Sequence, residues 1–471
     1  MEKKYLNLWS FKAMTLLIVI IAILGLLLIS TEKLTNINKA AVAIFTGTLC
    51  WVLYICYGAD FVLSQHSTDY HSFLGGAVAT SVTVKQYIAS NIFLKCVGRS
   101  AEIVLYLLAT MTIVQVLDNN GCFDFLKQLL RTRSGKRMLW MLSVITFVLS
   151  INLDNLTTTV MMLTMMHGVV QNRRQRMVLG AAIVISANIG GALTVIGDPT
   201  NLLIWNKSAV TATNFSLSLA IPCLIAWLLP VWWLGRMLPE RVDTAWIGLP
   251  YRGDDTRLNV WQRLLMLIVG IGGLWFIPTF HNITKLSPFL GALCVLSVLW
   301  IVNEIFNRKL NNVDKMIQSR VPRVLQYGVI QMMLFIVGIV LLVGVIIETG
   351  VLPWVASWVA VNIHNVWVIG TVAGLISTVL DNFATAATFF SFFDVATTSQ
   401  GFAAAMVQNG IYWKIIAFVV PAAGNVLGVG SMAGLALLKM EHMHVGWYLR
   451  NVGWKALVGC ALGMGAMYLM Y

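Results

Sequence analysis

Charge is scarce in this sequence of 471 residues: only 11% are Asp, Glu, Lys or Arg, while 58% are hydrophobic. Apolar runs recur from end to end, and many reach the roughly 20 residues that a membrane-spanning helix needs. So little charge over so long a chain excludes a large soluble domain. The sequence therefore predicts an all-α polytopic membrane protein with roughly ten spans.

Motifs of hydrolytic and thiol chemistry are also absent. The sequence contains no Gly-x-Ser-x-Gly, no His-Glu-x-x-His and no Cys-x-x-Cys, and its seven cysteines are scattered. An intramembrane hydrolase is the alternative function from another class of protein, and it would need a nucleophile with a base. We therefore expect neither enzymatic activity nor a bound cofactor.

Basic residues outnumber acidic ones by 32 to 19. They fall in short connections between apolar runs, which is typical of cytoplasmic loops and not of a nucleic-acid surface. We therefore expect a lipid bilayer and no nucleic acid as partner. The apolar run 13–30 follows a basic N-terminal segment without a small-x-small cleavage site, so we expect a retained span and a cytoplasmic N-terminus. This orientation requires residues 73–96 and 101–117 to be two separate spans.

Two copies of one short motif lie within these apolar runs. Residues 150–159 read SINLDNLTTT and residues 377–386 read STVLDNFATA. Desolvating a lone Asp in hydrocarbon costs at least about 2.5 kcal/mol, so such a residue usually faces a polar cavity, a partner or an ion. The simpler alternative is a helix cap. We take Asp154 and Asp381 as candidate functional residues.

The charges that flank the two copies differ. Arg137 precedes the first copy and the cluster from Arg173 to Arg176 follows it, so residues 138–170 are expected to enter and leave the membrane from the cytoplasm. Neither Lys nor Arg occurs in residues 348–365 or 394–412 around the second copy, which predicts a hairpin open to the outside. Backbone that turns at membrane depth lines a cavity or is buried in protein.

A glycine-broken apolar stretch follows each hairpin. Residues 186–201 read SANIGGALTVIGDPTN and residues 422–431 read AAGNVLGVGS. Glycines and a proline in such density predict that both helices are unwound near mid-membrane. Close packing through small residues is the alternative, but packing alone does not call for Asn188, Asp198 or Asn425.

Paired hairpins and broken helices of opposite orientation are typical of an inverted-repeat secondary transporter, with the substrate site where the breaks meet. The side chains at the breaks offer hard oxygen ligands with no Arg or Lys to bind an anion, which favours Na⁺, Li⁺ or H⁺ as the substrate. Burial favours a protonated carboxyl group and a bound cation favours the ionised form, so one Asp can carry either in turn. The candidate ion- and proton-binding residues are Asp154, Asn155, Asp381, Asn382, Asp198, Glu102, Ser150, Thr157, Thr158, Asn188, Thr200, Ser377, Thr385, Asn425 and Ser431. Of these, Asp154, Asp381, Asn155 and Asn382 are the expected Na⁺ ligands.

The doubled Asp-Asn motif, the Ala-Asn-x-Gly-Gly-Ala break and the late Gly-Ser-Met-Ala-Gly resemble the NhaD-type Na⁺/H⁺ antiporters of the ion transporter superfamily, from about Glu102 to Trp454. The resemblance implies a homodimer in the cell (inner) membrane that exchanges Na⁺ or Li⁺ for H⁺ by an elevator motion. It implies scaffold spans in 1–120 and 207–347, a mobile domain of the repeats 121–206 and 348–440, and a C-terminal span, 441–471, that ends outside. Roles are implied for Glu102, Asp154, Asn155, Asn188, Asp198, Thr200, Ser377, Asp381, Asn382 and Ser431.

Two other transport functions remain open. The Gly-Asp-Pro-Thr-Asn sequence at 197–201 looks more like the anion-permease branch, which favours sodium-coupled uptake of a di- or tricarboxylate. The Asp at each tip and the missing basic residue oppose that function. A channel is the second alternative, and saturable flux that depends on a counter-ion would distinguish a transporter from it.

Overall fold

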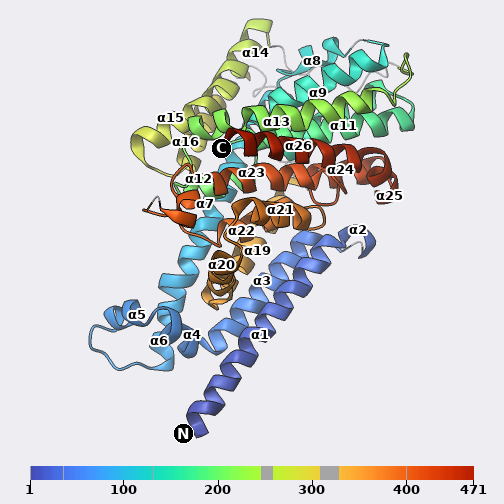
Figure 1. The fold of residues 1–471 in the computed structure, drawn as a ribbon. Coiled ribbons are helices and arrows are strands. Elements are labelled where there is room, and N and C mark those ends of the chain that lie inside the picture. Colours follow the sequence, from blue (N-terminus) through green and yellow to red (C-terminus); the bar gives the residue numbers. More distant parts are fainter. Residues whose placement is uncertain (1, 36, 131, 245–257, 308–327, 399) are drawn as a thin grey trace. The chain divides into compact units, whose positions relative to one another are not determined.

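The computed structural model describes residues 2–35, 37–130, 132–244, 258–307, 328–398 and 400–471 (Figure 1). These residues form helices, turns and three isolated β-bridges. Eight of the described helical segments are long and apolar enough to cross a membrane. The chain is therefore a polytopic, all-helical membrane protein, as the sequence predicts.

Two compact units make up the chain, and each is described by itself. Unit 1 comprises Met1–Val104, Ile330–Asn365 and Ala387–Asp394, and unit 2 comprises Leu105–Val329, Val366–Ala386 and Val395–Tyr471. The predicted division into scaffold and mobile parts stays a prediction.

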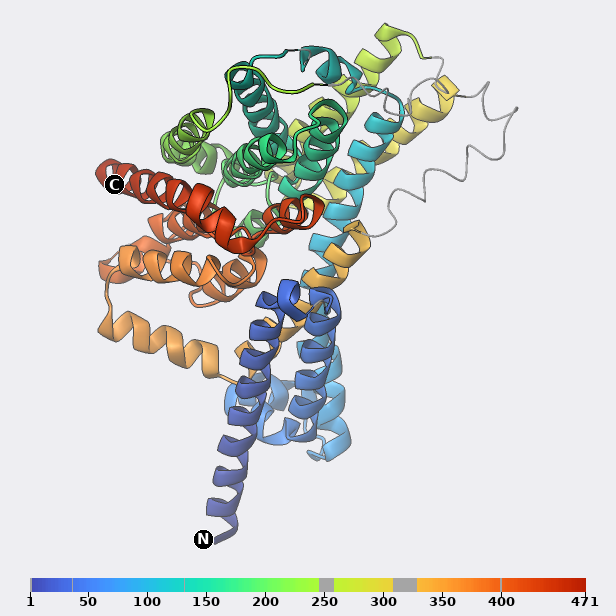
Figure 2. The same cartoon turned by 90° about the vertical axis from the view of Figure 1, so that its right-hand side faces the viewer.

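Unit 1 contains the N-terminal helices and the helices that precede the second Asp-Asn motif. Its elements are α1 (Glu2–Ser30), α2 (Glu32–Thr35), α3 (Lys39–Cys56), α4 (Gly58–Gln65), α5 (Ser67–Leu74), α6 (Ser81–Tyr87), the π-helix η1 (Ile88–Phe93), the start of α7 (Leu94–Asn119), α19 (Gly328–Glu348) and α20 (Val351–Asn362). Helices α1 and α3 pack side by side (Figure 2). The Trp51 indole of α3 donates a hydrogen bond to the Leu341 carbonyl of α19, 2.9 Å away, so α3 joins the first and second stretches of this unit.

The expectation of two separate spans at 73–96 and 101–117 is wrong. A single helical run crosses both segments, from Ser81 to Asn119. No proline or turn interrupts it, and one glycine inside a helix, Gly98, costs only about 1 kcal/mol. The two predicted segments therefore belong to one candidate span, and the orientation of the N-terminus stays a prediction.

Unit 2 contains both Asp-Asn motifs and both glycine-broken stretches. After the end of α7 come α8 (Asp124–Leu129), α9 (Gly135–Asn152), α10 (Asn155–Val169), α11 (Arg173–Ala192), α12 (Pro199–Asn206), α13 (Ala212–Gly235), α14 (Val260–Leu267), η2 (Ile268–Gly272), α15 (Gly273–Thr284) and α16 (Pro288–Asn307). The later elements are α21 (Val366–Ser377), α22 (Asn382–Phe390), η3 (Gly401–Met406), α23 (Ile411–Gly424), α24 (Met432–Met440), α25 (Val445–Tyr448), η4 (Leu449–Gly453) and α26 (Trp454–Met470).

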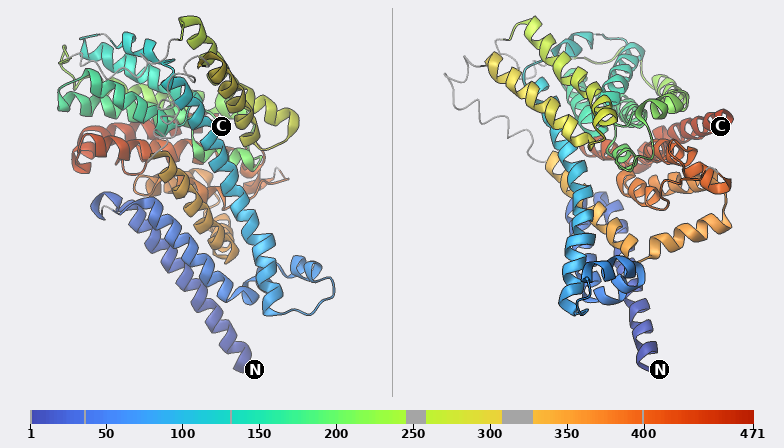
Figure 3. Two further views of the ribbon diagram at one scale, coloured as in Figure 1. Left: turned by 180° about the vertical axis from the view of Figure 1, so that it is seen from behind. Right: turned by 90° about the vertical axis from the view of Figure 1, so that its left-hand side faces the viewer.

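All four predicted interruptions occur in unit 2. The helix pairs α9–α10 and α21–α22 are each broken just before or at the Asp-Asn motif, and α11–α12 and α23–α24 are broken at the glycine-rich stretches. Each hairpin packs on the broken helix that follows it, α9 on α11 and α21 on α23 (Figures 1 and 3). The two copies therefore share one local architecture.

The two broken helices run antiparallel. The turn after α12 meets the segment before α23, where Asn409 N–H donates to the Ala209 carbonyl (2.8 Å) and Thr211 N–H donates to Asn409 Oδ1 (2.7 Å). The end of α24 meets the start of α11, where Arg173 Nη2 donates to the Glu441 carbonyl (2.7 Å). Each broken helix thus ends where the other begins.

Candidate ion-binding site

Both motif aspartates cap a helix. Asp154 Oδ1 accepts the Thr157 N–H (2.9 Å) at the start of α10, and Asp381 Oδ1 accepts the Phe383 N–H (3.0 Å) at the start of α22. The capping alternative is therefore correct for one oxygen of each carboxylate. It does not account for the whole group at Asp154, whose Oδ2 is buried without a hydrogen-bond partner among the described residues.

The two broken helices resume at caps of their own. Asp198 Oδ1 accepts the Thr200 N–H (2.8 Å) at the start of α12, and Ser431 Oγ accepts the Gly434 N–H (3.0 Å) at the start of α24. Four helix N-termini are therefore each capped by a side-chain oxygen. Three of these caps are carboxylates and the fourth is a hydroxyl, so the two repeats differ in charge at this point.

The motif serines join each hairpin to its broken helix. Ser150 Oγ donates to the Ala187 carbonyl (2.6 Å), and Ser377 Oγ donates to the Val420 carbonyl (2.8 Å). Both side chains are fully buried. Their hydroxyl protons are used in packing, so the structure gives these two predicted site residues a part in holding the tips in place.

A chain of side-chain amides links the two repeats. Asn155 Nδ2 donates to Asp198 Oδ2 (2.7 Å) and to Asn188 Oδ1 (3.2 Å). Asn188 Nδ2 in turn donates to Asn425 Oδ1 (2.8 Å) and to Ser431 Oγ (2.9 Å). Since all five residues are at least nine-tenths buried, the network fixes the first tip against both breaks.

Several buried oxygens at the two tips have no hydrogen-bond partner among the described residues. In the first repeat they are Asp154 Oδ2 and Thr158 Oγ1, and in the second they are Asn382 Oδ1 and Thr385 Oγ1. A buried polar atom without a partner is costly, and native proteins use such atoms where an ion or water completes the site. The chemistry of these oxygens suits a hard cation.

Negative charge dominates the electrostatics of this region. Asp198 lies within the electrostatic range of both Asp381 and Asp154. Segments 150–169, 186–206, 377–390 and 422–438, which carry the hairpin tips and breaks, contain neither Lys nor Arg. The arrangement therefore attracts a cation and repels a carboxylate substrate.

Fourteen of the fifteen predicted site residues lie in unit 2 and the last, Glu102, lies on α7 in unit 1. Thr157 stands one residue before the buried Thr158, and Thr200 is 2% exposed at the start of α12.

Sequence reasoning missed Tyr106, whose hydroxyl is buried without a partner among the described residues and lies within the electrostatic range of Asp154. A tyrosine in an apolar run gave no signal for this.

Sequence reasoning also left Asn201 out of the site. Its Nδ2 donates to the Thr194 carbonyl (2.8 Å) and to the Gly191 carbonyl (3.3 Å), so the side chain closes the unwound loop from within. Its Oδ1 is buried without a partner among the described residues. The signal was present in the Pro-Thr-Asn sequence that ends the first broken stretch.

Comparison with known proteins places the chain among membrane transporters. Residues 6–423 match the citrate transporter family. The chain is 31% identical over 373 residues to Sodium/proton antiporter 1 of Arabidopsis thaliana, covering 78% of this chain and 61% of that relative. It is 27% identical over 450 residues to Sodium/proton antiporter 2 of the same plant, covering 94% and 96%. It is 24% identical over 361 residues to Na⁺/H⁺ antiporter NhaD of Vibrio parahaemolyticus, covering 72% and 82%.

Proposed function

This chain belongs to the citrate transporter family, and within that family we propose that it is a cation exchanger. It is a secondary active transporter, not an enzyme, and it exchanges Na⁺ or Li⁺ for H⁺ across the membrane by alternating access. The observation that carries the proposal is the set of buried aspartates and unpartnered oxygens at the two tips, in segments without any basic side chain. The relatives named sodium/proton antiporter support it.

The exchange follows from competition for one carboxylate. A proton neutralises a buried Asp154 or Asp381, whereas a bound Na⁺ favours the ionised group. Each ion therefore displaces the other, and the oxygens of Asn155, Thr158 and Asn382 add neutral ligands for the metal ion. The amide network holds these groups in place, so the site needs little rearrangement to accept either ion.

Uptake of a carboxylate, as the family's description suggests, is the second candidate. A citrate ion carries several negative charges and needs basic or otherwise positive groups around it. The tip and break segments supply helix N-termini but neither Lys nor Arg, and their own carboxylates already occupy three of the four N-termini. Cation exchange therefore fits the site better.

The mechanism that we propose uses the two repeats as an inverted pair. The antiparallel broken helices and the matched contacts of Ser150 and Ser377 support this symmetry. Hairpins that re-enter the membrane from opposite sides would give each side its own access to the site. An elevator motion of a mobile domain in a homodimer, in the inner membrane of the cell, would then alternate that access.

Cysteine labelling tests the inverted topology. Arg174 lies beside the base of the first hairpin and Asn362 precedes the second, and both side chains are exposed. In a cysteine-free background, we expect Arg174→Cys to react with a membrane-impermeant maleimide only from the cytoplasm and Asn362→Cys only from the outside. Reaction of both from one side would refute the inverted pair.

The same experiment decides the position of the N-terminus. Three candidate spans, Lys12–Ser30, Lys39–Cys56 and Ser81–Asn119, precede the first hairpin. If that hairpin opens to the cytoplasm, an odd number of crossings places the start of α1 outside, and the end of α26 remains outside as the sequence predicts. A cysteine at Lys12 labelled only from the outside would support this arrangement, and labelling only from the cytoplasm would contradict it.

Proton flux in sealed vesicles tests the function itself. The purified full chain is reconstituted with an imposed pH gradient, and Na⁺, Li⁺, K⁺, succinate or citrate is then added. We expect Na⁺ or Li⁺ to collapse the gradient with saturable kinetics, and succinate or citrate to have no effect. Sodium-dependent uptake of a carboxylate without any response to cations alone would establish the second candidate instead.

A further inference from the structure

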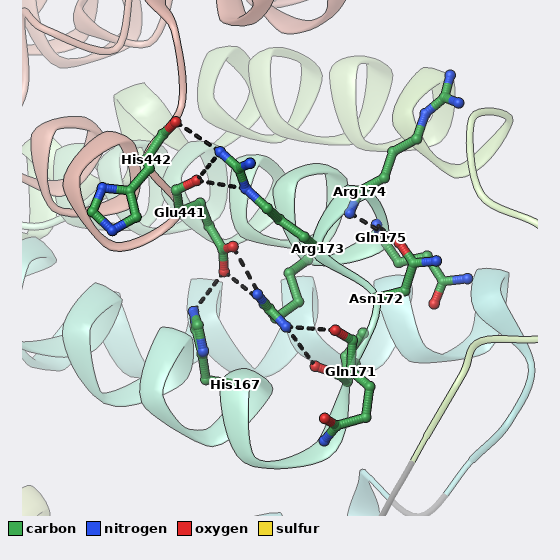
Figure 4. Close-up of polar contacts among 10 residues, drawn as sticks. His167, Gln171, Asn172, Arg173, Arg174, Gln175, Glu441 and His442 are labelled. Atoms are coloured by element: carbon green, nitrogen blue, oxygen red, sulfur yellow. Dashed lines mark hydrogen bonds and ion pairs between the residues drawn. The ribbon is translucent and has the colours of Figure 1, made fainter.

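A polar cluster lies at the ends of α10 and α24 and at the start of α11 (Figure 4). Its centre is Glu441, the C-cap residue of α24, whose side chain is only 1% exposed. Arg176 Nε of α11 donates to Glu441 Oε1 (2.9 Å) and Oε2 (3.2 Å). His167 Nε2, near the end of α10, lies 2.6 Å from the same Oε1.

The backbone at the end of α24 is held as well. The Arg173 guanidinium donates to the Glu441 carbonyl, from Nε at 3.0 Å and from Nη2 at 2.7 Å, and from Nη2 to the His442 carbonyl at 2.8 Å. Arg176 Nη1 also donates to the Gln171 carbonyl (2.7 Å) in the turn between α10 and α11. Arg173 of α11 thus binds the last carbonyls of α24, which a helix leaves without partners. Arg176 joins the Glu441 carboxylate to the turn that follows the first hairpin.

The same three helices carry the candidate site at their other ends or breaks. Helix α10 begins at Asp154, α24 begins at Ser431, and α11 carries Asn188 near its break. They pack against one another along their lengths. A shift of α24 at Glu441 is therefore transmitted along a rigid helix to Ser431 and, through its hydrogen bond, to Asn188.

We propose that Glu441 is a positioning residue for cation binding. Its carboxylate joins α24 to α10 and α11, and the charge of His167 makes the strength of this contact depend on pH. Glu441 keeps the three helices in register, so that Asp154, Asn188 and Ser431 remain aligned at the site. A protonated His167 adds a charge-assisted contact to the buried Glu441 carboxylate. When the His167 ring is neutral, Arg176 is the charged partner of that carboxylate. The inference rests on the proposed cation exchange.

The charges around His167 set the direction of the effect. Glu441 faces His167 from α24. From α11, Arg176 binds the same carboxylate, and Arg173 binds the Glu441 backbone carbonyl. The 239–244 segment contributes the backbone of Asp243, which bonds to Gln171 and Gln175. Protonation of His167 places a positive charge beside the Glu441 carboxylate. The contact between α10 and α24 is therefore stronger at acidic than at alkaline pH.

The test is the KM for Na⁺ of His167→Gln and of the wild type, measured in reconstituted vesicles from pH 6 to 8.5. We expect the variant's KM to exceed that of the wild type about fivefold at pH 6 and to match it at pH 8.5, within the usual range of coupling between sites. His442→Asn is the matched control, because this neighbouring side chain is exposed and its contact to Arg173 uses only the backbone carbonyl. Asparagine also tolerates the positive φ of 47° at residue 442.

Glu441→Gln completes a double-mutant cycle. Alone it should raise the KM at every pH, and adding His167→Gln should then change nothing, because both act through one carboxylate. Glu441→Gln leaves Arg176 without its carboxylate partner. If this variant does not insert into the membrane, the pH dependence of the KM of His167→Gln still tests the proposal. With the wild type active, a KM ratio that is constant over the whole pH range would overturn the role of His167, and an unchanged KM in Glu441→Gln would overturn the positioning role of Glu441. A wild type without cation-driven proton flux would instead overturn the proposed function.

Discussion

Replacing Asp154 or Asp381 with Asn should abolish Na⁺-driven proton flux while the protein still folds and inserts. Asn is as good a helix cap as Asp, so its Oδ1 keeps the bond to Thr157 N–H or to Phe383 N–H. The charge that attracts Na⁺ and the group that takes the proton are both lost. Leaving a buried ion without its charged partner costs about 3–5 kcal/mol, which corresponds to at least about a hundredfold loss of exchange.

The measurement is the initial rate of gradient collapse in vesicles with equal amounts of each variant, checked by size-exclusion chromatography. Asp69→Asn is the matched control, because it is the same chemical change at an exposed residue of α5. The two repeats need not be equal, since Asp198 caps the first broken helix and Ser431 the second. Exchange at the wild-type rate in both Asn variants would remove the mechanism proposed for this site.

The second large effect is expected at Gly430, in the break between α23 and α24. A Cβ atom there would overlap the Ser377 carbonyl oxygen of the neighbouring hairpin tip. The Gly430 carbonyl also accepts the Asn382 N–H (2.8 Å), so the backbone cannot move away without breaking that bond. Overpacking of this kind costs about 1–3 kcal/mol or more. The strained backbone would lie beside Asn382, a candidate ligand.

We therefore expect Gly430→Ala to lower the midpoint of thermal unfolding and to reduce exchange at least about tenfold, since 1.4 kcal/mol is a factor of ten. Gly197→Ala should behave alike, because its Cβ would lie 2.5 Å from the Ser150 carbonyl oxygen in the equivalent place of the first repeat. Gly465→Ala on the exposed face of α26 is the control, as nothing lies within 4 Å of its Cβ position. An unfolding midpoint and an exchange rate at wild-type values in Gly430→Ala would show that the tips do not need this close approach.

The interruptions of the helices could be predicted because their causes are local. Gly197 and Pro199 disfavour a continuous helix by themselves, and a carboxylate such as Asp154 within an apolar run is costly wherever the chain places it. The roles of the serines could not be predicted. Ser150 and Ser377 look like ion ligands in the motif, but their hydroxyls donate to carbonyls 37 and 43 residues away.

The spans of the N-terminal region show where sequence patterns are ambiguous. Lys95 and Arg99 make residues 94–101 look like a connection between two spans, yet the helix continues from Ser81 to Asn119. Whether a polar stretch ends a helix depends on what packs around it, because a helix without proline can pass through charged residues at a small cost. The number of candidate spans in this region therefore depended on the structure.

Composition alone determined that this protein is a polytopic, helical membrane protein, and the doubled motif alone indicated two repeats with aspartates at their tips. These properties follow from the cost of placing charge and unpaired backbone in hydrocarbon, which each segment pays regardless of its neighbours. Only the tertiary structure decided that Asn155, Asn188 and Asn425 form one network, and that Glu441 joins three helix ends. Such contacts join residues between 33 and 265 positions apart. Their geometry depends on how the helices pack, which no local pattern in the sequence records.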